Sequence, residues 1–449
     1  MEKEDIETHI VAFPFPAQGH INPMFQFCKR LASRGIKVTL ITYVDEDLIR
    51  TNYAKHPSIK MESICNNSDE NLTISSMEDY WKDFRSKLCT KLSEIVGKTQ
   101  NMPISCLVYD SIMPWALEVA REFGVSGASF FTQSCAVSAI YNQFHQGLLE
   151  IPDEEACVSV GGMPLMVYRD LPTSVGQNLE CPYHLSLMTT QFSNVKEADW
   201  IFFNSFDSLE HQVMKWMEIE YPLNLIGPAI PRNYLDNKEH GINLFKPNTN
   251  TYMDWLNSKE PSSVVYISFG SIAALPQNQM EQLANAFKSS KYNFLWVVRE
   301  SEQNKLPTTF LEGTSDKGLV VSWCSQPQVL SHSSVGCFVT HCGWNSTLEA
   351  LCLGVPMVAV PQWSDQLTNA KFIDDVWKVG VRVKVDGDGI VVKEELEFCI
   401  REVMEGDRAD EMRENCEKWK RLANEAMEEG GSSDKNIDQF VAELKGNVY

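Results

Sequence analysis

The residues best suited to do chemistry are concentrated between Trp323 and Gln366 of this 449-residue chain. An apolar run, VGCFVTH (335–341), ends in His341 and passes directly into CGWNS and the helical pattern TLEALCLG. A strand that leads into a helix N-terminus creates an anion site, because the first backbone N–H groups of the helix point outward. The arrangement then repeats as VPMVAVP (355–361), the polar loop QWSDQ and the pattern LTNAKFIDDVWKVG. Two such loops, at the carboxyl ends of neighbouring strands, can hold one ligand from both sides.

Each polar residue of this segment also has a structural interpretation. Asn345, Ser346 and Thr347 are all good helix-capping types. Trp323 can be a core aromatic residue, and His341 can be a buried histidine with satisfied hydrogen bonds. The last two residues of the segment can simply begin the next helix. It is the complete set, in register, that favours a ligand site.

The segment closely resembles the signature of plant family 1 glycosyltransferases, which use UDP-sugars, and it does so over its whole length without a gap. The resemblance implies a donor site. In this site, Trp323 stacks on the uracil. Gln326 and Glu349 hold the ribose hydroxyls. The diphosphate is bound by His341, Asn345 and Ser346. The sugar hydroxyls are hydrogen-bonded by Trp344, Asp365 and Gln366. A glutamine in the final position goes with a preference for glucose in this family, whereas a histidine would indicate galactose.

The elements that must position these residues alternate between strand and helix along both halves of the chain. Strand patterns of the first half are HIVAFPFP, IKVTLITY, ISCLVYD, SGASFFT, DWIFFNSF and LNLIGPAI. The alternation begins again with the strand pattern SSVVYISFGS and the helix pattern QNQMEQLANAFKSS. The strand patterns NFLWVV and GLVVSW follow. This alternation predicts an α/β protein with two doubly wound, Rossmann-like domains facing a cleft, and the resemblance names the architecture GT-B.

The expected domain boundaries follow from a change in composition. Residues 231–250 are polar and proline-flanked, so we place an interdomain linker there. An acceptor-binding domain is expected over residues 1–230 and a UDP-sugar-binding domain over 251–431. The resemblance implies that the final helix, within residues 432–449, packs back on the N-terminal domain.

Glycosyl transfer to a hydroxyl needs a base, and His20 in FPFPAQGHINP is the candidate. It follows the first strand pattern, in the loop before a helix, where doubly wound folds place ligands. An imidazole has a reference pKa of about 6.5, so it can accept a proton near neutral pH. Asp110 ends ISCLVYD and could fix the tautomer of that ring. Both occupy the positions where family members carry a catalytic His–Asp pair, although each could instead cap a helix.

Further ligand contacts are expected from two loops. Ser271, in the FGS turn after VVYIS, matches a phosphate-contacting position of the family, with a plain tight turn as the alternative. Thr132, in SFFTQS, matches a position that touches the 6-hydroxyl of the sugar. An acceptor pocket in the N-terminal half could be lined by aromatic residues, although most aromatic residues belong to cores. The candidates are Phe15, Tyr80, Trp81, Phe84, Phe131, Tyr141 and Phe144.

The implied reaction is an inverting transfer of glucose from UDP-glucose to a small lipophilic acceptor such as a terpenoid, steroid or phenolic. The acceptor group is a hydroxyl or a carboxyl, and the product is a β-glucoside. UDP-glucose is a co-substrate, and no cofactor or metal is expected, because a helix N-terminus, His341 and Ser271 can meet the charge of the diphosphate. The alternative is a non-catalytic protein that binds a sugar nucleotide or metabolite. A UDP-sugar epimerase would need acid–base residues directed at C2 of the sugar, and the sequence shows no such set. A dehydrogenase is disfavoured because FPFPAQGH is not a GxGxxG turn.

Composition narrows the classes of partner. The net charge of −21 argues against nucleic acid or an anionic membrane as partner. No apolar run is long enough to span a membrane, and the acidic N-terminus MEKEDIETHI is no signal peptide. Thirteen scattered cysteines without a C-x-x-C favour free thiols in a reducing compartment. We therefore expect a cytoplasmic monomer whose partners are its small-molecule donor and acceptor.

Overall fold

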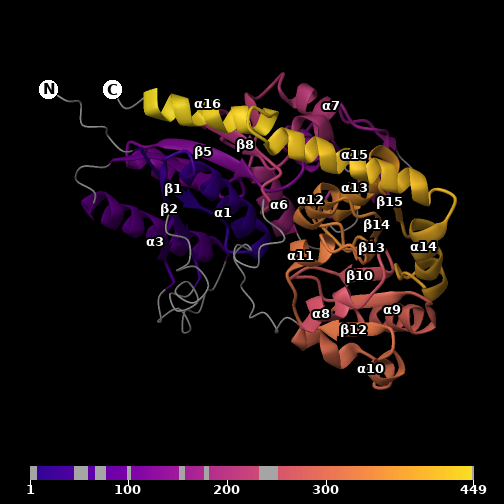
Figure 1. The fold of residues 1–449 in the computed structure, drawn as a ribbon. Coiled ribbons are helices and arrows are strands. Elements are labelled where there is room, and N and C mark those ends of the chain that lie inside the picture. The colour runs from indigo at the N-terminus through magenta and orange to yellow at the C-terminus, as the bar shows by residue number, and fades with distance from the viewer. Residues whose placement is uncertain are drawn as a thin grey trace. The chain divides into compact units, whose positions relative to one another are not determined.

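The computed structural model describes residues 8–44, 59–65, 77–98, 103–150, 157–175, 182–231 and 251–446. The chain forms two compact α/β units, coloured along the sequence in Figure 1. Unit 1 comprises Met1–Glu150, Cys181–Ile230 and Ala426–Tyr449. Unit 2 comprises Ile151–Glu180 and Pro231–Glu425. The predicted α/β class with two Rossmann-like domains is confirmed, since each unit is built on a parallel sheet with helices interleaved between the strands.

Unit 1 is built on a parallel sheet with the strand order β3-β2-β1-β4-β5-β8-β9 among its described residues. The strands are β1 (His9–Phe13), β2 (Lys37–Thr42), β3 (Ile59–Ser63), β4 (Ile104–Asp110), β5 (Ser126–Phe131), β8 (Trp200–Phe203) and β9 (Leu223–Leu225). The chain moves outward from β1 to β3 and then returns to β4 on the other side of β1. The carboxyl ends of β1 and β4 therefore flank the point where the strand order reverses, which is where such folds bind ligands.

The helices of unit 1 follow its strands, as the alternating pattern requires. They are α1 (Gln18–Ala32), α3 (Met77–Lys98), α4 (Trp115–Glu122), α5 (Cys135–His145), α6 (Pro182–Thr190), the short 3₁₀ turn Val195–Glu197, α7 (Asp207–Met217) and α16 (Ser432–Gly446). Helix α1 begins at Gln18, so His20 lies in its first turn and not in the preceding loop, which corrects the expected placement. Apolar residues of β1, β4, α3 and α4 form one continuous core.

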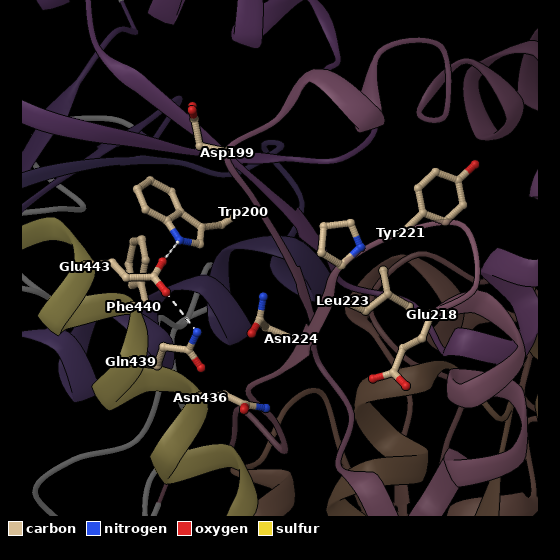
Figure 2. A pocket seen from close by; sticks show the side chains of 11 residues that line it. Asp199, Trp200, Glu218, Tyr221, Leu223, Asn224, Asn436, Gln439, Phe440 and Glu443 are labelled. Atoms are coloured by element: carbon tan, nitrogen blue, oxygen red, sulfur yellow. Dashed lines mark hydrogen bonds between the residues drawn. The ribbon is translucent and has the colours of Figure 1, made fainter. Parts of the chain in front are cut away.

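The last helix, α16, packs against the sheet of unit 1. Phe440 lies between the rings of Trp200 and Phe202, at centroid distances of 4.9 and 4.8 Å. Glu443 accepts a hydrogen bond from Nε1 of Trp200 at 2.7 Å (Figure 2), and Ser433 donates to the carbonyl of Gly227 at 2.6 Å. A segment more than 200 residues away along the chain thus completes one face of this unit.

Unit 2 repeats the same topology on a second parallel sheet, with the order β12-β11-β10-β13-β14-β15 in its described part. The strands are β10 (Val264–Ser268), β11 (Asn293–Val297), β12 (Gly318–Val321), β13 (Val335–Thr340), β14 (Met357–Ala359) and β15 (Gly380–Arg382). The order reverses between β10 and β13. Strands β10 and β13 are buried along almost their whole length, which explains their apolar sequences.

The helices of unit 2 are α8 (Thr251–Asn257), α9 (Gln277–Ser289), the 3₁₀ helix Glu300–Lys305, α10 (Phe310–Gly313), α11 (Gln326–Leu330), α12 (Trp344–Leu353), α13 (Gln366–Lys371), α14 (Lys393–Glu405) and α15 (Ala409–Met427). The helix expected over LTNAKFIDDVWKVG is α13 followed by a π-helical turn, Phe372–Val376.

A segment of the first half of the chain also belongs to unit 2. The expected N-terminal domain covered residues 1–230, but residues 151–180 group with unit 2. Their described part contains the short hairpin of β6 (Cys157–Val158) and β7 (Met166–Val167), followed by the 3₁₀ turn Tyr168–Asp170. We call residues 157–175 the strap.

Two further expectations concern membranes and thiols. Among the described residues no helix has the length and apolar character needed to cross a membrane. Every cysteine in the described part of the chain has a free thiol.

Candidate functional site

A histidine and a carboxylate meet at the switch point of the unit 1 sheet. Nδ1 of His20, in the first turn of α1, lies 2.8 Å from Oδ2 of Asp110, the last residue of β4. The two strands that deliver them are neighbours, with Phe13 of β1 paired to Tyr109 of β4. The side chain of Asp110 is fully buried, whereas that of His20 is 25% exposed. The histidine side chain is therefore partly accessible to solvent, whereas the carboxylate is not.

The carboxylate of Asp110 is fixed by backbone groups as well. It accepts hydrogen bonds from the N–H of Phe15 at 3.3 Å and of Ile112 at 3.4 Å. These donors hold the carboxylate in place beside the imidazole. A carboxylate on Nδ1 favours the tautomer with its proton there, which makes Nε2 the nitrogen that can accept a proton.

Thr132 also contacts His20. Its Oγ1 lies 3.0 Å from Nδ1 of the imidazole, directly after β5. Its side chain is therefore part of the environment of His20 in this structure, a contact that the sequence did not indicate. The role expected for it, a hydrogen bond to the sugar's 6-hydroxyl, remains a proposal.

Aromatic side chains line the region next to His20. The ring of Phe15 lies edge-on to the imidazole at 5.3 Å, and Trp81 lies 6.1 Å from Phe15. Nε1 of Trp81 donates to the hydroxyl of Tyr183 at 2.7 Å. Phe15 and Trp81 are partly exposed, so this aromatic wall is within reach of a bound molecule.

The other acceptor-lining candidates divide by burial. Tyr80 and Phe144 are partly exposed, and Tyr80 stacks on Phe84 at 5.6 Å. Phe84, Phe131 and Tyr141 have at most 1% of their surface exposed. These three are core residues, and they contribute packing beneath the site and no accessible lining.

The switch point of the unit 2 sheet holds His341. The ring follows β13 and stands between the turn after β10 and the start of α12. A Cβ atom added to Gly270 would lie 2.7 Å from Nε2 of His341, and one added to Gly343 would lie 2.5 Å from it. Both positions therefore need glycine so that the imidazole can sit between the two loops. Gly270 needs it for a second reason, because its φ is +75°.

The environment of His341 sets its protonation. Desolvation lowers the pKa of His341 to about 4, so the ring is neutral at pH 7. A neutral imidazole can donate one hydrogen bond to a phosphate but adds no positive charge. Helix α12 starts at Trp344 with Gly343 as N-cap, so Asn345 and Ser346 lie in its first turn and neither they nor Thr347 is the N-cap. Its N-terminus favours an anion through backbone N–H groups and the helix dipole.

A hydrogen-bonded group lies beside the N-terminus of α12. Nε2 of Gln326 donates to Oγ of Ser346 and to Oε2 of Glu349, both at 2.8 Å. Desolvation raises the pKa of Glu349 to about 7. The structure thus joins three of the expected donor residues, although they lie 23 positions apart.

The remaining donor candidates differ in exposure. Trp323 is partly exposed shortly after β12, as a stacking surface must be. Trp344 is only 4% exposed and its ring packs 6.0 Å from that of Trp377, so its indole is largely a core group. Asp365 is the N-cap residue of α13, and its Oδ2 accepts from Asn369 at 2.8 Å. Oε1 of Gln366 accepts the N–H groups of Gln362 and Trp363.

Ser271 is partly exposed in the turn after β10. Its carbonyl accepts a hydrogen bond from Nη1 of Arg299 at 2.8 Å, and Arg299 also donates to the carbonyl of Ala273. The guanidinium therefore fixes the course of this loop. The sequence analysis did not single out Arg299, because a lone arginine after a strand gives no local signal.

A separate cavity of about 380 Å³ lies along α16 in unit 1 (Figure 2). Its walls include Asp199, Trp200, Tyr221, Asn436 and Glu443. None of the expected site residues lines it. Within the described residues, no group of three or more His, Cys, Asp or Glu side chains is placed to hold a metal ion.

Comparisons with known proteins identify relatives along the whole chain. The model of the family described as UDP-glucoronosyl and UDP-glucosyl transferase matches residues 35–422. The chain is 48% identical to mogroside I-E synthase of Siraitia grosvenorii over 454 residues, covering 99% of this chain and 100% of that protein. It is also 48% identical to UDP-glucosyltransferase 74AE2 of Panax ginseng, covering 98% and 99%.

The fold has solved counterparts too. Os79 of O. sativa in complex with UDP matches with a TM-score of 0.88 at 36% identity, over 97% of this chain and 100% of that one. The same protein in complex with U2F and trichothecene matches with a TM-score of 0.86, again at 36% identity and over 97% and 100% of the two chains.

Proposed function

The chain belongs to the family of UDP-glucuronosyl and UDP-glucosyl transferases and is a glycosyltransferase, and from this premise we propose that it transfers glucose from UDP-glucose to a small lipophilic acceptor with inversion at the anomeric carbon. The acceptor is a terpenoid, steroid or phenolic that presents a hydroxyl or carboxyl group. His20 is the general base, and Asp110 orients it. The product is a β-glucoside.

The observation that carries this proposal is the pairing of His20 with the buried carboxylate of Asp110. Their 2.8 Å contact fixes the ring through Nδ1, and the 25% exposure of the histidine keeps the side chain within reach of solvent. A base needs both properties, a held tautomer and access to its substrate. A helix cap would require neither.

The donor half of the proposal rests on unit 2. Trp323 is assigned to the uracil, and Gln326 with Glu349 to the ribose. The N-terminus of α12, with Asn345, Ser346 and His341, is assigned to the diphosphate, together with Ser271. Trp344, Asp365 and Gln366, with Thr132 of unit 1, are assigned to the glucose hydroxyls. The binding of UDP by Os79, whose chain aligns over its full length, supports this assignment.

The proposed reaction is a single in-line displacement. Nε2 of His20 removes the proton of the acceptor hydroxyl, and the acceptor oxygen forms a bond to C1 of the α-linked glucose. The bond between C1 and the diphosphate oxygen breaks, and UDP leaves from the opposite face with the electron pair. The α12 N-terminus and His341 stabilise the charge of that leaving group through hydrogen bonds. A carboxylate acceptor is already ionised, so its transfer depends less on His20.

The proposed acceptor surface is the aromatic wall of Phe15 and Trp81 beside His20. It suits a flat or fused-ring molecule because offset and edge-on aromatic contacts stabilise such partners. Tyr80 and Phe144 are the other partly exposed candidates. The complex of Os79 with U2F and trichothecene supports the proposal of a small-molecule acceptor.

Product analysis tests the reaction directly. Purified protein is incubated with UDP-glucose and a panel of hydroxylated and carboxylated lipophilic acceptors, in the presence of EDTA. We expect glucosides whose anomeric proton shows the large NMR coupling of a β-linkage, at rates that EDTA leaves unchanged. An α-linked product would contradict inversion, and loss of activity in EDTA would contradict metal independence. Tight UDP binding without turnover across the panel would favour a binding protein.

A further inference from the structure

The strap, residues 157–175, lies against the loop that carries Asp365 and Gln366. It groups with unit 2, although the chain on both sides of residues 151–180 belongs to unit 1. Its 3₁₀ turn Tyr168–Asp170 contacts α13, the helix that begins at Gln366. The donor loop of unit 2 is thus braced by residues that lie about 190 positions earlier in the sequence.

An ionic cluster anchors the strap to unit 2. Asp170 is 3% exposed, and its carboxylate accepts a hydrogen bond from Nη1 of Arg382 at 2.7 Å and lies 3.6 Å from Nζ of Lys371. Arg382 also donates to the carbonyl of Arg169 at 2.7 Å. The carbonyl of Asp170 accepts from Oγ1 of Thr368 in α13 at 2.7 Å. Charged and neutral hydrogen bonds therefore hold the strap in one register against α13.

Thr173 then binds both backbone groups of one residue. The N–H of Ser364 donates to Oγ1 of Thr173 at 2.8 Å, and the N–H of Thr173 donates to the carbonyl of Ser364 at 3.1 Å. Ser364 has a φ of +60°, in the left-handed region that residues other than glycine adopt only at a cost. Such a conformation persists when surrounding contacts enforce it. Thr173 supplies a matched donor and acceptor for that purpose.

The backbone at Ser364 determines where the next two side chains point. Asp365 is the N-cap residue of α13 and Gln366 is its first helical residue. Oε1 of Gln366 closes the loop by accepting the N–H groups of Gln362 and Trp363 at 2.9 and 3.1 Å. A change at Ser364 would therefore alter the direction of both side chains together.

We propose that Thr173 is a positioning residue for the donor sugar, which acts by holding Ser364 in its left-handed conformation so that Asp365 and Gln366 meet the hydroxyls of glucose. Thr173 thereby sharpens the discrimination between UDP-sugars that differ in one hydroxyl. This inference rests on the proposed function, in which those two side chains contact the sugar. The uracil, ribose and diphosphate contacts are assigned to residues elsewhere in unit 2, so this inference does not require the strap to affect them.

The test replaces the hydroxyl of Thr173 while keeping the shape of the side chain. Thr173→Val removes the acceptor for the N–H of Ser364, and Thr173→Ser retains it as the matched control. Initial rates are measured with UDP-glucose and with UDP-galactose, its C4 epimer, on one acceptor. Affinity for UDP, which has no sugar, is measured by calorimetry on the same preparations and shows that each variant is folded.

We expect Thr173→Val to raise KM for UDP-glucose and lower kcat/KM about tenfold, in keeping with the loss of one hydrogen bond that leaves a donor unsatisfied. The preference for UDP-glucose over UDP-galactose should fall, UDP affinity should stay within about twofold, and Thr173→Ser should behave like the wild type.

Two results would overturn the inference while leaving the proposed function intact. One is a Thr173→Val variant with the donor preference of the wild type. The other is an equal loss of rate with both donors accompanied by weaker UDP binding, which indicates a purely structural role. A wild type that transfers no glucose would overturn the proposed function, and this inference would fall with it.

Discussion

At the scale of single residues, burial shifts the pKa values of two groups of the proposed donor site in opposite directions. Desolvation lowers the pKa of His341 to about 4 and raises that of Glu349 to about 7. His341 is thus neutral throughout the neutral range, while Glu349 titrates within it. A ribose hydroxyl donates its hydrogen bond to the ionised carboxylate more strongly than to the acid. Donor binding should therefore release a proton from Glu349 below about pH 7.

This linkage predicts that UDP-glucose affinity falls as the pH falls. With a pKa of about 7, the ionised fraction of Glu349 drops about tenfold between pH 8 and pH 6, and affinity should drop by a similar factor. Calorimetry in buffers of different ionisation enthalpy measures both the affinity and the protons released. UDP-glucose is the suitable probe, because its diphosphate diester does not titrate in this range.

Glu349→Gln supplies the control for that experiment. The amide keeps the shape of the side chain and has no ionisation, so affinity should be weaker but independent of pH from 6 to 8. A pH dependence that survives in this variant would assign it to another group.

The pairing of His20 with Asp110 could be predicted because the resemblance places the two residues in a catalytic pair, and the apolar patterns place Asp110 at the end of a strand and His20 shortly after another. The contact of Thr132 with His20 could not, since the chain pattern gives no register between β5 and α1. The burial of the individual aromatic candidates could not be predicted from the sequence either. Phe84, Phe131 and Tyr141 are of the same residue types as the partly exposed Phe15, Tyr80 and Phe144, and only packing separates the two groups.

At the scale of elements, the loop from β13 into α12 shows how a neighbouring side chain can restrict the residue type at a helix N-cap. The sequence offers Asn345, Ser346 and Thr347 as caps, yet Gly343 is the N-cap and none of these side chains is. The φ and ψ of Gly343, −58° and 144°, are available to any residue. Glycine is needed there because a Cβ would lie 2.5 Å from Nε2 of His341.

Gly343→Ala is therefore predicted to act by displacing the imidazole. A Cβ at that distance must push His341 out of the space between the two loops, so UDP affinity should fall about tenfold or more through loss of the hydrogen bond proposed between His341 and the diphosphate. Gly387→Ala is the matched control, since a Cβ there meets nothing within 4 Å. Calorimetry with UDP measures both variants. Equal affinity in the two would show that His341 does not need this space.

The alternation of strands and helices could be predicted from the sequence because buried parallel strands are continuous apolar runs. VGCFVTH and ISCLVYD match β13 and β4 to within one residue. The structure of the strap and its contacts with α13 could not be predicted. Its strands are two residues long, and the contacts join positions far apart in the chain. Short elements held by distant polar contacts leave no periodic pattern.

At the scale of the whole molecule, the C-terminal helix α16 is part of the core of unit 1. Phe440 is 1% exposed and contacts Trp200, Phe202 and Phe27. Ion pairs add to this packing, with the carboxylate of Asp434 joined to the guanidinium of Arg34. Part of one face of the unit 1 sheet is therefore covered by α16.

Phe440→Ala is predicted to lower the free energy of unfolding of unit 1 by about 3–5 kcal/mol, the usual cost of removing a fully buried aromatic side chain. Denaturant unfolding followed by fluorescence measures the loss, and Trp200 provides a probe in contact with the site. Phe398→Ala is the control, because that side chain is 48% exposed in α14 and its removal should cost less than about 1 kcal/mol. Similar losses for both variants would contradict the role given to α16.

The most direct test of the account is the initial rate of glucoside formation on a hydroxyl acceptor by His20→Ala, measured beside the wild type and the exposed control His145→Ala. General-base catalysis is worth about 10²–10⁴-fold, so the His20 variant should lose at least about a hundredfold in kcat. Its UDP affinity should be unchanged, because the proposed UDP contacts lie in unit 2, and His145→Ala should retain full activity. A His20→Ala enzyme that glucosylates the hydroxyl acceptor at the wild-type rate would contradict the proposed mechanism.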